Sequence, residues 1–172
     1  AHSKKEMAKA LKELSSQEVT TIDYLEAYKE QEHAVYLGFS NLANEFYPEV
    51  PAGISIQNNE GNNQERFRIS AKIQNDASDG INEVKIFCYD LNNLINSSVH
   101  HFQSIFHDSR MFSDIDPRQR AVLLKKAHTL TKASGMQYIA TMNEDQLISL
   151  KDVLAEEEFE EIFGTVRLEL KD

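Results

Sequence analysis

Apolar residues in the first quarter of the chain recur at alternating steps of four and three. This spacing places them on one face of a helix, and it is typical both of the root of a coiled coil and of a helix packed on its own domain. Small polar residues at positions 15–21 interrupt the seam and favour a break with a new N-cap. We therefore expect a short helix, a joint at 15–21 and a long helix that ends before Pro48. The seam consists of Met7, Leu11, Leu14, Leu25, Tyr28, Val35, Phe39, Leu42 and Phe46.

Two later segments alternate apolar and polar residues, which is the period of a half-exposed β-strand. They span residues 53–57 and 66–73. The residues between them, 58–63, are rich in asparagine and glycine and suit a turn. We expect an antiparallel hairpin with a loose loop.

The pattern becomes helical after a loop at residues 75–80. Apolar residues at helical spacing predict a helix from Ile81 to about Ser97, and a short buried strand then ends at Asp108. The predicted apolar face of this helix consists of Val84, Phe87, Cys88, Leu91, Leu94 and Ile95.

A helix with clear start and stop signals follows that strand. Asp116 suits the N-cap, Pro117 the first helical position and Gln119 a capping box, and Gly135 suits the C-terminal stop. A strand at 137–141 comes next, so strand, helix and strand predict a right-handed βαβ unit with parallel strands. The predicted buried stripe of the helix is Val122, Leu123, Ala127, Leu130 and Ala133.

The C-terminal part contains one more helical and one more extended pattern. Asn143 opens a helix that runs to Leu154, the acidic residues 156–161 indicate solvated surface, and residues 165–170 alternate like an edge strand. The whole pattern predicts an α/β fold with a mixed sheet around a parallel βαβ core, a β-hairpin and an N-terminal helical arm. We expect the arm to span residues 1–47 and the α/β lobe residues 48–172.

Composition places the chain among soluble globular proteins. It has 172 residues, 41% of them hydrophobic and 27% charged. No apolar run approaches the roughly 18 residues needed to cross a bilayer, and no signal-peptide pattern opens the chain, so we expect a cytoplasmic protein without a membrane partner. Because the chain begins without methionine, we also expect it to be a piece of a longer protein.

Charge and cysteine content exclude several classes of site. The net charge of -10 argues against a wide nucleic-acid-binding face, since phosphate contacts need clustered Lys and Arg. The single cysteine, Cys88, excludes an internal disulfide and a Cys-rich zinc site. Its place in an apolar helical pattern favours a small core residue over a nucleophile.

Candidate chemistry gathers around the strand that ends at Asp108. This carboxylate is followed by the Ser109 hydroxyl, with Asp114 and Asp116 a short loop away. An aspartate at a strand end commonly holds a Mg²⁺ ion that itself holds phosphates. The alternative is structural: Asp108 caps a turn and Asp116 caps a helix.

Two further groups of residues could bind a phosphate or a metal ion. Residues 78–80, Ser-Asp-Gly, stand immediately before a helix, where free backbone N–H groups favour phosphate. His100, His101 and His107 flank Asp108, but adjacent strand residues point to opposite faces, which disfavours a histidine metal site. The sequence contains no Gly-x4-Gly-Lys-Ser/Thr loop, no Ser-His-Asp order and no Cys-His pair.

The residues quoted above carry a family resemblance. Residues 78–91, 105–112, 116–119 and 137–141 resemble the C-terminal DUF2326 domain of uncharacterised bacterial proteins. Those proteins look like SMC/Rad50/RecN-type ATPases of the ABC class, in which a P-loop lobe, a long coiled coil and a C-terminal lobe form one head. The resemblance implies ATP and Mg²⁺ as cofactors, an N-terminal P-loop lobe as partner, a homodimer of heads around ATP, and DNA contact through the full assembly, in DNA repair or defence.

The resemblance also implies residue roles. Ser78 and Gly80 match the signature loop that touches the γ-phosphate held by the opposite subunit, and Asp79 and Asn82 lie beside them. Asp108 matches the Walker B aspartate that supports Mg²⁺. The D-loop aspartate corresponds to Asp114 or Asp116, and the switch position to Thr141 or Asn143.

Two positions depart from the family pattern. Ser109 stands where most ABC ATPases have a catalytic glutamate, and a hydroxyl is a poor general base at neutral pH. Asp79 replaces a glycine and brings negative charge towards the γ-phosphate. We expect slow or unusual hydrolysis or a nucleotide-gated clamp, with Asp114 as a substitute carboxylate and no ATP turnover by this chain alone. The alternatives are a non-catalytic assembly module and a nuclease that holds a metal at residues 114–116.

Overall fold

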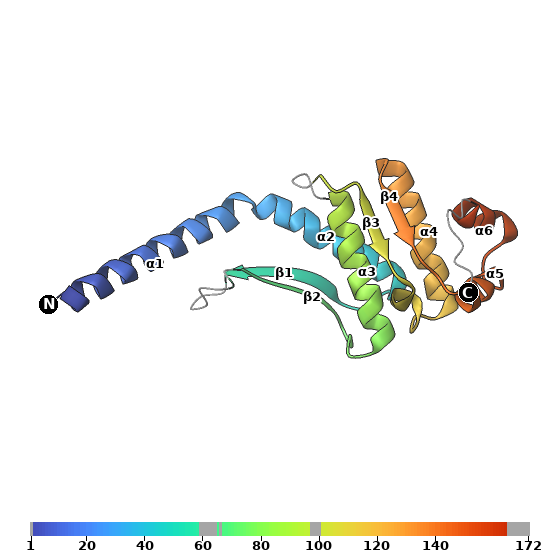
Figure 1. The fold of residues 1–172 in the computed structure, drawn as a ribbon, viewed down its shortest axis with the longest axis horizontal. Helices are drawn as coiled ribbons and strands as arrows, with labels where there is room; N and C mark the ends of the chain where they lie inside the picture. The colour runs from blue at the N-terminus through green and yellow to red at the C-terminus, as the bar shows by residue number, and fades with distance from the viewer. Residues whose placement is uncertain (1, 59–64, 66, 97–100, 165–172) are drawn as a thin grey trace.

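The computed structural model describes residues 2–58, 65, 67–96 and 101–164. Two N-terminal helices lead into a hairpin, a central helix, a βαβ unit and two short helices (Figure 1). The elements in chain order are α1 (His2–Ala27), α2 (Lys29–Phe46), β1 (Ala52–Asn58), β2 (Phe67–Ile73), α3 (Asp79–Asn96), β3 (Ser104–His107), the 3₁₀ helix η1 (Ser109–Phe112), α4 (Pro117–Ser134), β4 (Gln137–Ala140), α5 (Glu144–Lys151) and α6 (Glu156–Phe163).

Within the predicted arm, α1 projects away from the rest of the fold, and α2 packs into the core with its last turns (Figure 1). The predicted joint at residues 15–21 is wrong, because α1 continues through it. The Thr20 and Thr21 hydroxyls donate to the carbonyls four residues earlier, so these polar side chains are satisfied inside the helix. The break instead occurs at Tyr28, whose φ of -105° and ψ of 13° leave the helical range. As predicted, α2 ends before Pro48.

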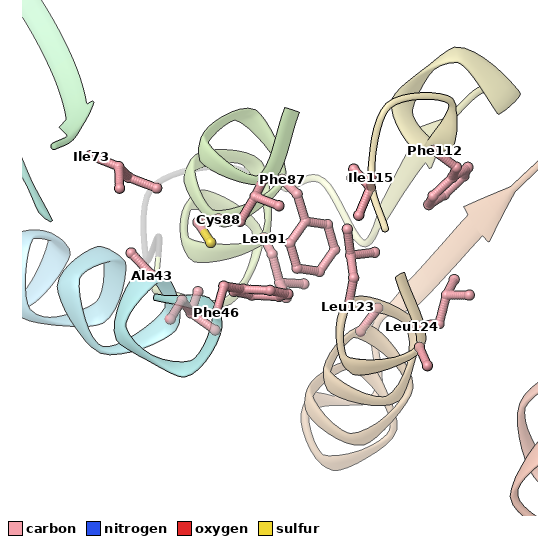
Figure 2. Close-up of a cluster of buried hydrophobic side chains, with 14 of the residues drawn as sticks. Ala43, Phe46, Ile73, Phe87, Cys88, Leu91, Phe112, Ile115, Leu123 and Leu124 are labelled. Carbon is pink, nitrogen blue, oxygen red and sulfur yellow. The ribbon is translucent and has the colours of Figure 1, made fainter. Parts of the chain in front are cut away.

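The hairpin and α3 form as predicted and supply much of the core. β1 and β2 pair antiparallel, with Ile54 opposite Ala71. The core lies where α2, α3 and α4 meet, and Phe87 of α3 contacts Phe46 of α2 edge-on (Figure 2). Cys88 is fully buried in this core, and burial raises the pKa of its thiol to about 12, which confirms its interpretation as a core residue.

The predicted parallel βαβ unit is confirmed. β3 and β4 pair in parallel with His107 opposite Ala140, and α4 connects them. Among the described residues the strands form two separate two-stranded sheets, one antiparallel and one parallel. Asp116 caps α4 by accepting from the Arg118 backbone N–H at 2.9 Å, and Gly135 ends it with a φ of 70°.

The buried face of α4 differs from the predicted stripe. Val122 and Ala133 are exposed, and the side chains of Arg120, Ala121 and Leu124 are buried instead. The buried face of α4 is rotated from the predicted one because the Arg120 side chain points into the fold and donates to polar groups there. A pattern of hydrophobic residues does not predict the burial of an arginine. The strand before Asp108 is also less buried than predicted, since the Phe106 side chain is 56% exposed.

The C-terminal helices pack beside α4. Asn143 opens α5, as the sequence predicted, and forms a capping box with Gln146, but α5 ends at Lys151 rather than Leu154. The acidic run forms most of α6, whose residues are not fully buried. The predicted strand at 165–170 lies outside the described residues. Within the described residues, none of the helices combines the length and apolar character that a membrane span requires.

Candidate functional site

The N-terminal end of α3 touches the loop that follows η1. A Cβ atom on Gly80 would lie 2.6 Å from the backbone oxygen of Asp114, closer than real side chains approach. The Glu83 carboxylate, one turn later, accepts a hydrogen bond from the Asp114 backbone. Burial and the neighbouring Asp114 charge raise the pKa of Glu83 above its ordinary value. The structure therefore brings the predicted phosphate-binding turn and the predicted aspartate loop together.

Replacing Gly80 with alanine tests this close approach. The new methyl group must push the Asp114 backbone away, so we expect backbone amide chemical-shift changes at residues 113–116 in NMR spectra. Gly53→Ala is the matched control, because a Cβ there meets no atom within 4 Å. Unchanged shifts around Asp114 in Gly80→Ala would show that the two segments do not touch.

Asp108 lies at the carboxyl end of β3 and points into solvent. One carboxylate oxygen accepts from the Arg110 backbone N–H at 2.9 Å, so the structural alternative of a turn cap is present. The residue also lines an open pocket of about 400 Å³ together with Asn82 and Glu83 of α3 and Arg110. The predicted metal-supporting carboxylate and the first turn of α3 thus border the same hollow.

Hydrogen bonds of main-chain groups connect the end of the parallel sheet to α5. They involve Ser109, Thr141 and Asn143. The Ser109 carbonyl accepts from the Gln146 side chain at 3.0 Å, and the Thr141 N–H donates to the His107 carbonyl at 3.1 Å. The Asn143 N–H donates to the Gln146 side chain at 2.9 Å. These contacts bring the predicted switch positions to the strand end that carries Asp108.

Ser78 and Asp79 are exposed, and Ser78 supplies a carbonyl to the Asn82 N–H. Asp116 is also exposed, and its carboxylate accepts the hydrogen bond that caps α4. Among the described residues no three His, Cys, Asp or Glu side chains form a group that could hold a metal ion by themselves. Asp108 would therefore need further ligands, such as nucleotide phosphates or water, to hold Mg²⁺.

Three polar residues near this edge are buried, which the sequence pattern did not predict. Arg120 donates to the carbonyls of Phe112 at 2.7 Å and Ile115 at 3.0 Å and so braces the loop between them. Gln146 of α5 donates to the Ser109 carbonyl of η1, and His107 lies inside the fold at the end of β3. The spacing of Asn143 and Gln146, which suits a capping box, could have indicated the role of Gln146. Arg120 lies among apolar residues, and no sequence signal indicated its burial.

The comparison with protein families agrees with the resemblance to DUF2326. The family model described as "Uncharacterised protein conserved in bacteria (DUF2326)" matches residues 42–172. No curated protein matches the chain. A solved structure titled "Crystal structure of the SmcHead bound to the C-winged helix domain of ScpA" is similar with a TM-score of 0.44 and 14% identity. The match covers 69% of this chain and 37% of that one, so the chain spans well under half of that structure's length.

Proposed function

We propose that this chain, which belongs to the DUF2326 family, is the C-terminal half of an SMC-like ATPase head. In this role it would supply a signature turn at residues 78–80, a magnesium-supporting aspartate at Asp108 and a D-loop at residues 114–116. ATP and Mg²⁺ would bind only in the complete head, with a P-loop lobe as partner and a second head closing over the nucleotide.

One observation carries this proposal: the convergence of three segments at one edge of the fold. Gly80 meets the Asp114 backbone, while Asn82 and Asp108 line one pocket. Helix N-termini favour phosphate through free N–H groups, and a strand-end carboxylate favours Mg²⁺. The turn would therefore offer donors to the nucleotide held by the opposite head, and Asp108 an oxygen ligand to the metal of its own head.

The site lacks an assigned base for hydrolysis. Ser109 occupies the position after Asp108, and its carbonyl is engaged by Gln146. A serine hydroxyl is a poor general base at neutral pH, so it would not take the proton of the attacking water. We therefore propose slow turnover or a clamp that ATP closes, with Asp114 as the substitute carboxylate.

Mixing the chain with a P-loop lobe of the same protein tests the proposal. We expect association, measured by light scattering, only with ATP and Mg²⁺, and at least about tenfold weaker association in Ser78→Arg, because a bulky side chain blocks the phosphate-binding turn. Thr129→Arg is the matched control, since Thr129 is exposed on α4. Association that ignores ATP, or equal effects of both variants, would contradict the proposal. So would ATP turnover by the chain alone that Asp108→Ala abolishes.

A second candidate is a non-catalytic assembly module. Apolar side chains are exposed on the arm, where Met7 is 68% and Leu11 60% exposed, and on the sheet, where Phe106 is exposed. Such side chains favour partner chains. In that case association with partners should be independent of ATP and should fall in Leu11→Glu, while Ser78→Arg should have no effect.

A further inference from the structure

The residue before Asp108 is a buried histidine with both ring nitrogens engaged. His107 is 6% exposed. Its Nδ1 lies 2.9 Å from the Tyr138 hydroxyl of β4, and its Nε2 lies 3.1 Å from the Asp90 carboxylate of α3. The three side chains therefore join β3, β4 and α3 in one hydrogen-bonded chain.

The chemistry of these groups selects one arrangement of protons. An ionised Asp90 can only accept a hydrogen bond, so Nε2 of His107 must carry a proton. In the neutral ring Nδ1 then has a lone pair, and the Tyr138 hydroxyl donates to it. Burial, with the Asp90 charge nearby, raises the pKa of Tyr138 and keeps this hydroxyl protonated. The other neutral tautomer would set a lone pair of Nε2 against the carboxylate.

The same residue is also held by packing and by its main chain. The His107 ring meets the Tyr138 ring edge-on, with centroids 5.5 Å apart, and lies 6.1 Å from the Phe87 ring. Its carbonyl accepts from the Thr141 N–H. With the ring fixed inside the fold, the next side chain along β3 must point outward, where the exposed Asp108 lies.

We propose that His107 is the positioning residue for Asp108, held as the Nε2–H tautomer by Asp90 and Tyr138. The role rests on the proposed function of Asp108 as the carboxylate that supports Mg²⁺. Asp90 lies on the same helix that carries Gly80 and Asn82 at its N-terminal end, so α3 joins the signature turn to the strand that carries Asp108. The Asp108 carboxylate accepts from the Arg110 N–H, so the His107 ring would act on it through the backbone that follows His107.

Nitrogen-15 NMR of the imidazole in this chain reads the tautomer directly. We expect the neutral His107 ring to give signals of a single Nε2–H form, and Asp90→Asn to introduce the Nδ1–H form, because an amide can donate to Nε2 as well as accept from it. A wild-type ring in the Nδ1–H form, or in rapid exchange between the two forms, would overturn the assignment.

The hydrogen bond from the Arg110 N–H to the Asp108 carboxylate tests the positioning in this chain without metal, because the Arg110 amide proton signal in NMR spectra reports where the carboxylate lies. We expect Tyr138→Phe and Asp90→Asn to move this signal towards its position in Asp108→Ala, where no carboxylate accepts from the N–H. Tyr89→Phe is the matched control, because it removes a hydroxyl of α3 outside the chain of three. His107→Gln, which keeps an N–H near the place of Nε2, should move the signal less than His107→Ala. Thermal unfolding of each variant separates these effects from loss of the fold.

The outcomes separate this inference from the proposed function. The same Arg110 amide signal in Tyr138→Phe, Tyr89→Phe and the wild type overturns the positioning role. If the signal moves as expected but the P-loop lobe does not associate, the proposed ATPase head is wrong and the positioning role of His107 stands.

Discussion

Replacing Arg120 with methionine should lower the free energy of unfolding by about 3–5 kcal/mol, because it leaves several buried polar groups without partners. The guanidinium donates to the backbone oxygens of Phe112 and Ile115 on one side. On the other side it donates to the Ser149 hydroxyl at 3.0 Å and, more weakly, to the Gln146 carbonyl at 3.4 Å. Methionine fills a similar volume but donates to none of these oxygens.

The Arg120 guanidinium is buried, so its charge alone does not explain the expected loss of stability. Arg120 is 5% exposed, and burial lowers its pKa, while the Asp145 and Asp116 charges oppose this shift. Arg120→Lys should recover less than half of the lost stability, because one ammonium group does not reproduce the two-sided fork of the guanidinium.

Urea unfolding followed by circular dichroism measures these changes. Arg118→Met is the matched control, since Arg118 is exposed two residues earlier on the same helix and its side chain should contribute little. If Arg120→Met and Arg118→Met unfold at the same urea concentration, the contacts of Arg120 do not stabilise the loop.

Features set by neighbours in the chain were predictable from the sequence. The cap of α4 at Asp116 and the stop at Gly135 depend on a few adjacent residues, and both occur as expected. The burial of Cys88 follows from the period of α3, and the hairpin from alternation in both strands. In each case the pattern and the final packing favour the same answer.

Features set by distant contacts were not predictable. The inward turn of Arg120 depends on carbonyls of a loop and on α5, and the burial of His107 depends on Asp90 and Tyr138. The position of the helix break, at Tyr28 rather than at residues 15–21, was not predictable either. Threonine hydroxyls can donate to carbonyls within a helix as readily as they cap one. For the candidate site, the sequence indicated the residues, whereas their meeting at Gly80 and Asp114 became evident only in the fold.

Gly38 provides a second test in which packing opposes local propensity. In the interior of a helix, Gly→Ala ordinarily stabilises by about 1 kcal/mol. Here a Cβ would overlap the Asn92 carboxamide and lie 2.7 Å from the Asn96 side-chain nitrogen. Asn92 is fully buried and donates to the Val35 carbonyl at 3.0 Å, so it joins α3 to α2 at their contact.

We expect Gly38→Ala to destabilise the fold by about 2–3 kcal/mol, because the methyl group displaces Asn92 and leaves a buried amide without its partner. A double-mutant cycle isolates the cause. Asn92→Ala removes the group that the new methyl group strikes, so Gly38→Ala should cost at least about 1 kcal/mol less in that background than in the wild type. Urea unfolding of the four proteins supplies the measurement, and Gly53→Ala, which meets open space, controls for the added methyl group. A more stable Gly38→Ala protein would mean that helix propensity decides at this position and that α2 and α3 do not pack through Asn92.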